Sequence, residues 1–286
     1  MTAIDILFTA DENYAVHIPV VLKSIKINDP QTSYHVHMIH GPMAQDVLDH
    51  LNAYCKMLGY GFNNYEVPEK LFGEMPVNKH YSKAMYYRIL AGEILPKSCK
   101  RMLYLDPDVL VINSLAPLWK LTLGSKTFAA ASHIMEEGVI NNINQLRLRT
   151  DAIYYNTGVL LMDLNLMRKL VVREEVFSFL RQNSSRLLLP DQDVFNSLFW
   201  REVQQIPDEL WNYDVRKYSP RYLMSGGSLN ETWIIEHTAI LHYCGKAKPW
   251  NASYRYRFGN LYRHYQHLYK KDVQSICIEN RMSPRL

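Results

Sequence analysis

The sequence contains no apolar run that approaches the roughly 20 residues needed for a membrane-spanning helix. It also lacks the basic segment and apolar stretch of a secretory signal peptide, because acidic residues follow soon after Met1. The cysteines are scattered and include no Cys-x-x-Cys pair: Cys55, Cys99, Cys244 and Cys277. We therefore expect reduced thiols in a cytoplasmic protein.

A Gly-x-Gly-x-x-Gly motif is also missing, so the sequence lacks the backbone phosphate cradle of dinucleotide-binding folds. Any nucleotide would have to be held by side chains. Asp11, Asn13 and Tyr14 follow the first apolar run, and they could hydrogen-bond to a base and stack on it. The alternative is that Asp11 and Asn13 only cap the helix that follows.

The net positive charge is concentrated at the C-terminus, whereas acids balance the Lys and Arg of the main body. The formal net charge is +4, but the residues from Asn251 onward carry seven Lys or Arg against two acids. We therefore expect no nucleic-acid binding by the body. Over 254–270, aromatic residues alternate with Arg, Lys and His, which suits peripheral contact with an anionic membrane surface. The alternatives are a helix packed on the body with its tyrosines in the core, or a nucleic-acid patch.

Apolar runs of strand length alternate with segments of helical apolar spacing. The expected strands cover 4–10, 34–39 and 61–67, and the expected helices cover 15–25 and 43–58. Repeated βαβ units predict an α/β fold with a mainly parallel central sheet flanked by helices. The 286 residues suffice for one large domain with an appendage. We place the domain at 1–250 and a basic, aromatic C-terminal extension at 251–286.

The segment 101–113 is organised around two carboxylates. An apolar run ends in Asp106-Pro107-Asp108, and a second apolar run follows at once. Side chains two residues apart in an extended segment point the same way, so Asp106 and Asp108 can converge on one ion. Oxygen ligands at this spacing suit Mg²⁺ or Mn²⁺. The alternative is a polar turn between two strands.

Two other segments carry polar residues that could face a ligand. Arg88 lies within a helical pattern at 82–95, where it is either solvated or a clamp for phosphate or carboxylate. Asp191 and Gln192 follow Pro190 at an expected helix start. There an aspartate could equally serve the helix dipole.

The last apolar run leads into His242, Gly245 and Lys248. An imidazole is a possible metal ligand, glycine allows close approach of the backbone to an anion, and lysine supplies a positive charge for phosphate. The alternative is a structural histidine. The basic, glycine-containing segment beside His242 favours the functional interpretation.

Taken together, these segments resemble glycosyltransferase family 8, which includes bacterial lipopolysaccharide galactosyl- and glucosyltransferases and glycogenin. The resemblance depends on ordered motifs between about residues 4 and 250. They are FTADENYA, the segment with Arg88, LYLDPDVLV, YYNTGVLLMDL, LPDQDVFN and HYCGKAKPW. The set is specific in this order, whereas each motif alone is not. The most similar subgroup is that of the lipooligosaccharide α-galactosyltransferases.

The resemblance implies a GT-A fold and retaining transfer of glucose or galactose from UDP-glucose or UDP-galactose to a glycan, glycolipid or glycoprotein. It implies Mn²⁺, with Mg²⁺ as an alternative, held by Asp106, Asp108 and His242. The implied residues for the nucleotide and its diphosphate are Thr9, Ala10, Asp11, Asn13, Tyr14, Arg88, Asp106, Pro107, Asp108, Gly245 and Lys248. The implied residues around the donor sugar are Arg88, Asn156, Asp191 and Gln192. Because an amide is a poor nucleophile, we expect the acceptor to attack the sugar on the same face from which the leaving group departs. Gln192 would support this attack electrostatically.

One departure leaves the donor hexose open. Where the subgroup has an acid that contacts the sugar, this chain has Ser132-His133, and the next acid is Glu136. Two other functions compete with transfer: UDP-sugar binding without turnover, and metal-dependent nucleotidyl transfer or hydrolysis. The expected location is cytoplasmic, with possible peripheral contact at the inner face of the membrane.

Overall fold

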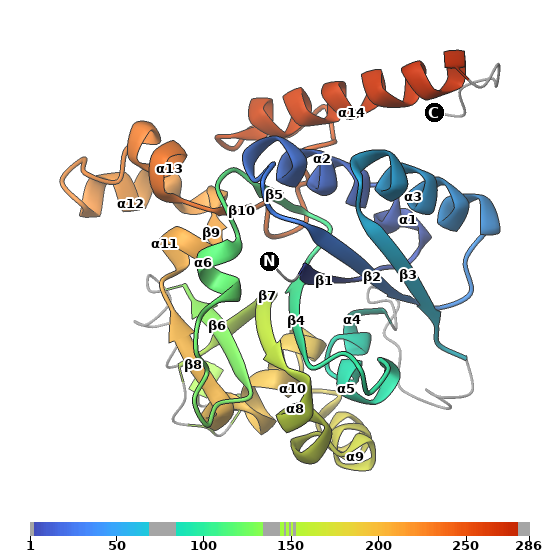
Figure 1. The fold of residues 1–286 in the computed structure, drawn as a ribbon. Helices are drawn as coiled ribbons and strands as arrows, with labels where there is room; N and C mark the ends of the chain where they lie inside the picture. The colour runs from blue at the N-terminus through green and yellow to red at the C-terminus, as the bar shows by residue number, and fades with distance from the viewer. Residues whose placement is uncertain are drawn as a thin grey trace.

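The computed structural model describes residues 3–68, 84–133, 144–145, 147–148, 150 and 153–279 (Figure 1). A seven-stranded sheet has the order β3-β2-β1-β4-β7-β6-β8, and a three-stranded sheet has the order β5-β10-β9. The strands of the large sheet are β1 (Ile4–Thr9), β2 (Tyr34–His40), β3 (Gly61–Glu66), β4 (Arg101–Leu105), β6 (Phe128–Ser132), β7 (Tyr155–Asp163) and β8 (Val203–Ile206). The strands of the small sheet are β5 (Val109–Val111), β9 (Tyr213–Asp214) and β10 (Ile240–His242).

Helices connect these strands and cover both faces of the large sheet. They are α1 (Glu12–Ala15), α2 (Ile18–Asn28), α3 (Gln45–Leu58), α4 (Ala84–Tyr87), α5 (Ala91–Ile94), α6 (Ala116–Trp119), α8 (Leu164–Leu170), α9 (Arg173–Asn183), α10 (Pro190–Leu198), α11 (Asp208–Trp211), α12 (Tyr218–Met224), α13 (Glu231–His237) and α14 (Gly259–Glu279). Short 3₁₀ turns occupy Trp200–Glu202 and Val215–Lys217. No helix in the described part of the chain is long and apolar enough to cross a membrane.

The large sheet is mainly parallel, which confirms the predicted fold class. Only β7 runs against its neighbours, β4 and β6. The chain order reverses at β1, which has β2 on one side and β4 on the other. In open α/β sheets, ligands bind beyond the carboxyl ends of the strands at such a reversal. Asp11 follows the end of β1 and Asp106 follows the end of β4, so both predicted segments reach this position.

Alternate side chains of β1 enter different cores, as the period of an extended strand requires. Ile4, Ile6 and Phe8 pack with α2 and α3 on one face, whereas Leu7 packs with α4 and α8 on the other. Figure 1 shows these helix layers above and below the sheet.

Two of the expected helices are divided. The pattern at 15–25 forms α1 and α2, and Pro19 lies in the first turn of α2, where its missing N–H costs nothing. The described part of the pattern at 82–95 forms α4 and α5. Between them the chain tightens into hydrogen bonds of the three-residue type, such as Ile89 N–H to Tyr86 O at 3.0 Å. Arg88 lies in this turn rather than in a helix, which corrects the prediction.

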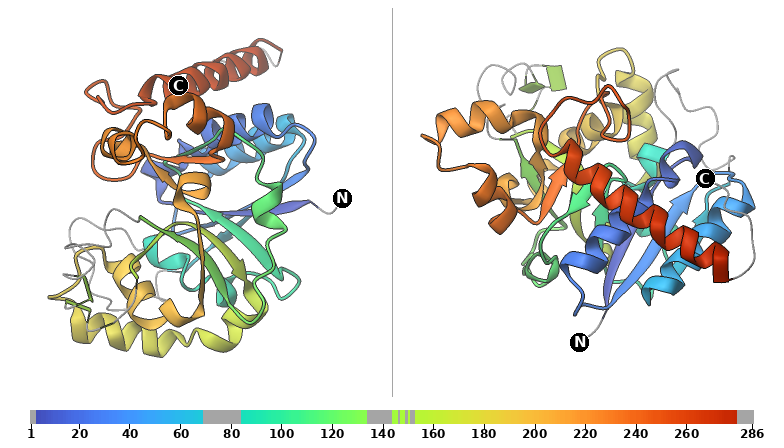
Figure 2. Two further views of the ribbon diagram at one scale, coloured as in Figure 1. Left: turned by 90° about the vertical axis from the view of Figure 1, so that its left-hand side faces the viewer. Right: turned by 90° about the horizontal axis from the view of Figure 1, so that it is seen from above.

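The C-terminal segment packs on the body. Helix α14 packs across α2, as the views in Figures 1 and 2 show. Tyr262 and Tyr265 are buried in the same core as Tyr213, and Asn28 Nδ2 donates to Tyr265 Oη at 2.8 Å. The boundary expected after residue 250 therefore divides a shared core. The tyrosines have the role foreseen in the packed-helix alternative, and contact of the outer basic face with a membrane stays a prediction.

Cys55, Cys99 and Cys244 are free, as expected for reduced thiols. The side chain of Cys277 lies outside the described residues.

Candidate active site

The small sheet brings the two predicted halves of a cation site together. Strand β10 pairs antiparallel with β5, and His242 lies opposite Val109. The Tyr243 N–H also donates to the Asp108 carbonyl at 3.0 Å. This backbone pairing places His242 beside Asp108, although the two are far apart in the chain.

Asp106, Asp108 and His242 form a compact group of possible metal ligands. One ligand atom from each lies within 4.8 Å of the others. His242 Nε2 is 3.3 Å from Asp108 Oδ1 and 3.8 Å from Asp106 Oδ2. Two carboxylates and one imidazole suit Mn²⁺, and they also accommodate Mg²⁺. The group is where the sequence predicted it, and its role as a metal site stays a prediction.

Gly158 forms the wall of this group. The Asp106 N–H donates to the Gly158 carbonyl at 2.8 Å, which holds the end of β4 against β7. A Cβ atom on Gly158 would lie 2.2 Å from His242 Cε1 and 2.7 Å from Asp106 Oδ2. The backbone therefore leaves space between the ligands that any side chain would fill. This role was not predicted, although the glycine lies in the YYNTG segment that the sequence analysis singled out.

Asn212 fixes the orientation of the His242 ring, and no pattern in the sequence pointed to it. Asn156 Oδ1 accepts from the Gly158 N–H at 2.9 Å and from Asn212 Nδ2 at 2.9 Å. The Asn212 amide must therefore turn its oxygen toward His242 Nδ1, which lies 2.7 Å away. An N–H on Nδ1 leaves Nε2 facing the carboxylates, which is the usual arrangement for a metal-binding histidine.

We expect Asn212→Leu to weaken divalent-cation binding at the group by about 10- to 100-fold, because His242 would lose the hydrogen bond that orients its ring. Mn²⁺ titration followed by electron paramagnetic resonance measures the change. Asn212→Asp is the matched control, because it keeps an acceptor for His242 Nδ1 and should retain more affinity. Equal affinity in the native and Asn212→Leu chains would contradict this role.

Arg88 bridges two carboxylates at the edge of the group. Its Nη1 is 3.0 Å from Asp106 Oδ1, its Nη2 is 3.7 Å from Asp191 Oδ2, and Nη1 also donates to the Thr157 carbonyl at 3.0 Å. Burial disfavours the guanidinium, but Asp106 and Asp191 outweigh it and raise the pKa of Arg88. Burial raises the pKa of Asp191 against the opposing effect of Arg88. Arg88 is therefore a fixed positive charge, as its predicted role requires.

Lys248 lies on the other side of the group, where its Nζ donates to Asp108 Oδ2 and to the Tyr243 carbonyl. Burial disfavours the Asp108 carboxylate, but Lys248 and His242 outweigh it and lower the pKa of Asp108. Gly245, at φ 87°, lies against Arg216, and a Cβ there would be 2.5 Å from Arg216 Nη1. Only a residue without a side chain fits this position. Arg216 comes from the 3₁₀ turn Val215–Lys217, where it also pairs with Asp214 at 2.6 Å, and no pattern in the sequence pointed to it.

The predicted base-binding segment lies next to Lys248. Asp11 accepts from the Tyr14 N–H at 3.2 Å and so caps α1, as the alternative interpretation held. The Tyr14 side chain is 38% exposed, so a face remains for a ligand. Its ring meets Trp250 edge to face at 5.9 Å, and Trp250 also stacks on His17 at 3.7 Å. No pattern in the sequence indicated this aromatic group, because its members lie in segments far apart in the chain.

The other residues predicted at the nucleotide are Thr9, Ala10, Pro107 and Asn13. Thr9 and Ala10 are buried at the end of β1, and the Thr9 hydroxyl is 3.2 Å from Tyr104 Oη. Pro107 is buried between the two aspartates. Asn13 is exposed on α1.

Helix α10 contributes Gln192 from the opposite side. Gln192 is partly exposed, and its Oε1 is 3.4 Å from Asn156 Nδ2. The buried Asn196 holds the helix in place. Its amide accepts from the Tyr155 N–H at 2.7 Å and donates to the Tyr155 and Gln192 carbonyls, each at 2.8 Å. This clamp brings Asp191, Gln192 and Asn156 to one region, as predicted.

The chain places a neutral histidine where an acid was expected from the subgroup. His133 is buried, its Nε2 lies 3.2 Å from the Asn212 carbonyl, and burial lowers its pKa to about 3. Ser132 is buried as well. Glu136 lies outside the described residues.

Comparison with known proteins identifies one family and several relatives. A model of the family described as glycosyl transferase family 8 matches residues 5–253. General stress protein A of Bacillus subtilis is 28% identical over 268 residues, which cover 91% of this chain and 92% of the relative. The lipopolysaccharide 1,2-glucosyltransferase of Escherichia coli K12 is 24% identical over 256 residues, which cover 87% of this chain and 73% of the relative. A structure of galactosyltransferase LgtC in complex with donor and acceptor sugar analogs has a TM-score of 0.78 and 26% identity, with 93% of this chain and 96% of that one covered.

Proposed function

The chain belongs to glycosyltransferase family 8, and from this premise we propose that it is a retaining, metal-dependent hexosyltransferase. It moves glucose or galactose from a UDP-sugar to a glycan, a glycolipid or a glycosylated protein. The observation that carries the proposal is the convergence of Asp106, Asp108 and His242 beside Lys248 and Arg88 at the point where the strand order reverses. Carboxylates that can hold a metal ion lie there beside fixed positive charges that can bind phosphate oxygens, as a diphosphate bound through a metal ion requires.

Asp106, Asp108 and His242 would hold Mn²⁺ or Mg²⁺, which would neutralise negative charge on the departing diphosphate. Lys248 and Arg216 add positive charge on the same side and bind phosphate oxygens. Tyr14 stacks on the base, with Asp11 and Asn13 as hydrogen-bonding partners. The donor is thereby anchored by its nucleotide, and its sugar is directed toward α10.

Arg88, Asn156, Asp191 and Gln192 orient the donor sugar. Arg88 is fixed by two carboxylates and two backbone carbonyls, and Asn156 by Gly158 and Asn212, so neither has to reorganise when the donor binds. Gln192 presents an amide oxygen rather than a carboxylate. We therefore propose that Gln192 stabilises the positive charge that develops on the sugar. The acceptor then attacks on the same face from which the diphosphate departs.

The first test is release of UDP from UDP-glucose and from UDP-galactose, with Mn²⁺ and with EDTA. We expect slow Mn²⁺-dependent release from one donor, no release in EDTA, and no release by the Asp108→Ala variant. Tight UDP binding with Mn²⁺ but no turnover, even with glycan acceptors, would instead indicate a UDP-sugar-binding protein.

A second test addresses Gln192. We expect Gln192→Ala to lower kcat by roughly a hundredfold, comparable to the loss of one electrostatic contact to a transition state. Its affinity for UDP should not change, which calorimetry can show. Complete loss of turnover with intact UDP binding would argue that Gln192 does more than support.

A further inference from the structure

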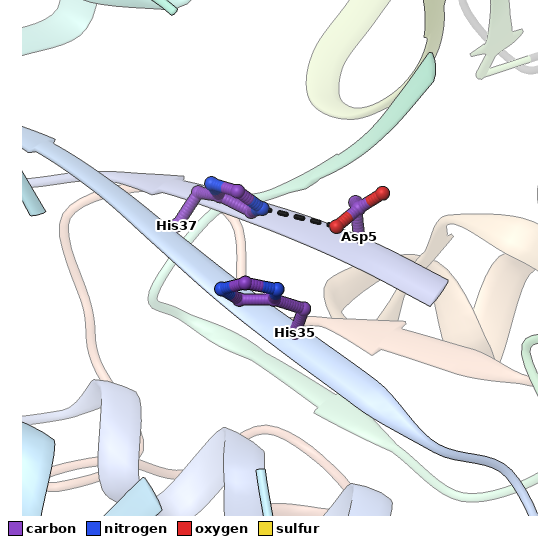
Figure 3. A group of neighbouring side chains, drawn as sticks. All are labelled: Asp5, His35 and His37. Carbon is purple, nitrogen blue, oxygen red and sulfur yellow. Dashed lines mark hydrogen bonds and ion pairs between the residues drawn. The ribbon is translucent and has the colours of Figure 1, made fainter. Parts of the chain in front are cut away.

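A second group of metal-binding side chains lies on the large sheet, away from the proposed transferase site. It consists of Asp5 on β1 with His35 and His37 on β2 (Figure 3). Asp5 is four residues before Thr9 on the same strand, which corresponds to about 13 Å. Asp5 shares a face of the sheet with Leu7, so the group lies on the side covered by α4 and α8. No step of the proposed transfer uses these residues.

The pairing of the two strands brings the three side chains together. Asp5 is the register partner of His35, and His37 follows two residues later on the same face. His37 Nε2 is 3.0 Å from Asp5 Oδ1, and the imidazole rings of His35 and His37 stack with centroids 4.6 Å apart. One ligand atom from each residue lies within 4.8 Å of the others. In a tetrahedral zinc site these atoms would be about 3.3 Å apart, so modest rotations of the side chains close the group.

Strand β3 supplies a partner for the other nitrogen of each ring. His37 Nδ1 is 3.1 Å from the Tyr65 hydroxyl, and His35 Nε2 is 2.8 Å from Asn63 Nδ2. The Cδ2–Nε2 edge of His35 also faces Gly61, where a Cβ would lie 3.0 Å from Cδ2. The opposite edge, with Nδ1, therefore faces away from β3. Each imidazole is thus held through one nitrogen, and its other nitrogen can face a metal beside Asp5. Binding through His35 Nδ1 requires a proton on Nε2, so the Asn63 amide would then present its oxygen to that nitrogen.

The burial of the group fits a metal with one further ligand from solvent. The His37 side chain is 3% exposed, whereas that of Asp5 is 33% exposed. The alternative is a simple hydrogen bond between Asp5 and His37. That alternative does not account for the second imidazole stacked on the first, with its own partner on β3.

We propose that Asp5, His35 and His37 bind a divalent transition metal of the zinc type, with water as the fourth ligand. Two imidazoles and one carboxylate are a typical Zn²⁺ donor set, whereas the two carboxylates of the transferase group suit a harder ion. The bound ion joins β1 to β2 and stabilises the strand whose end carries Asp11.

The experiment measures Zn²⁺ and Co²⁺ binding to the full chain in the Asp106→Asn, Asp108→Asn background, which disables the first group. Equilibrium dialysis should give about one tight Zn²⁺ per chain. Co²⁺ should give the visible absorption of a tetrahedral ion. Saturating Zn²⁺ should raise Tm by about 5 °C, because it binds only the folded state. Adding His35→Asn should lower Zn²⁺ affinity at least tenfold and remove the Co²⁺ spectrum.

Two comparisons separate this site from other metal binding. Replacing His264 and His267, which are exposed on α14, by asparagine should change nothing. In the otherwise native chain, His35→Asn should leave Mn²⁺ and UDP binding unchanged, so this site and the transferase proposal can fail independently. Because His35 is only partly buried, its variant should fold, which circular dichroism checks. No Zn²⁺ binding at micromolar concentrations, or binding that is insensitive to His35→Asn, would overturn the proposal.

Discussion

Gly158→Ala is expected to abolish divalent-cation binding and to lower transferase activity by roughly a thousandfold. The added methyl group would lie 2.2 Å from His242 Cε1 and 2.7 Å from Asp106 Oδ2, far inside van der Waals contact. Neither neighbour can retreat easily. His242 is held by Asn212, and Asp106 by Tyr104 and Arg88. Loss of the cation would remove several kcal/mol of transition-state stabilisation.

Mn²⁺ titration and the donor-hydrolysis assay measure both effects. Gly92→Ala is a suitable control, because Gly92 lies in α5 and its nearest neighbour to an added Cβ is the flexible Met167 side chain at 3.2 Å. That variant should bind Mn²⁺ like the native chain. Native Mn²⁺ affinity in a folded Gly158→Ala chain would contradict the placement of the cation between Asp106 and His242.

Asp193→Ala is expected to lower the free energy of unfolding by about 3 kcal/mol, because it removes a buried carboxylate that accepts several hydrogen bonds. Asp193 is fully buried, and its two oxygens accept from Arg147 at 2.6 and 2.7 Å. It also accepts from the Tyr154 hydroxyl at 2.6 Å and from the Leu188 and Leu189 N–H groups. The alanine variant removes this buried acceptor from the Arg147 guanidinium, the Tyr154 hydroxyl and two backbone N–H groups at once.

Urea denaturation measures this loss. Asp49→Ala is the matched control, because Asp49 is exposed on α3 and accepts only from Gln45 among the described contacts. Its effect should remain within about 0.5 kcal/mol. A loss below about 1 kcal/mol for Asp193→Ala would show that the buried network contributes little. Since α10 carries Asp191 and Gln192, we also expect reduced transfer by the Asp193→Ala chain.

The pair Asp191 and Asp193 shows where local sequence ceases to be informative. Both acids lie in the first turn of α10, and local sequence offers the same two interpretations for each, a helix-start residue or a ligand contact. In the structure Asp191 meets Arg88 at the site, whereas Asp193 anchors a segment on the other side of the helix. Residues two apart on a helix point in different directions, so the choice depends on what surrounds it.

The C-terminal helix shows the same limit. Its alternation of aromatic and basic residues fits a membrane surface and a packed helix equally well. Tyr262 and Tyr265 are buried because α2 and the small sheet offer an apolar surface at that position. The composition of the segment could not show that surface.

The alternation of strands and helices, the mainly parallel sheet, the family and the short motifs at the strand ends could all be predicted from the sequence. These follow from local periodicity and from residues that are neighbours in the chain. The folded chain adds contacts that the sequence does not record: Asn212 on His242, the Gly158 backbone against His242 and Asp106, and Asp5 against two histidines of β2. Such contacts join segments whose approach is set by strand pairing and core packing, so no local pattern records them.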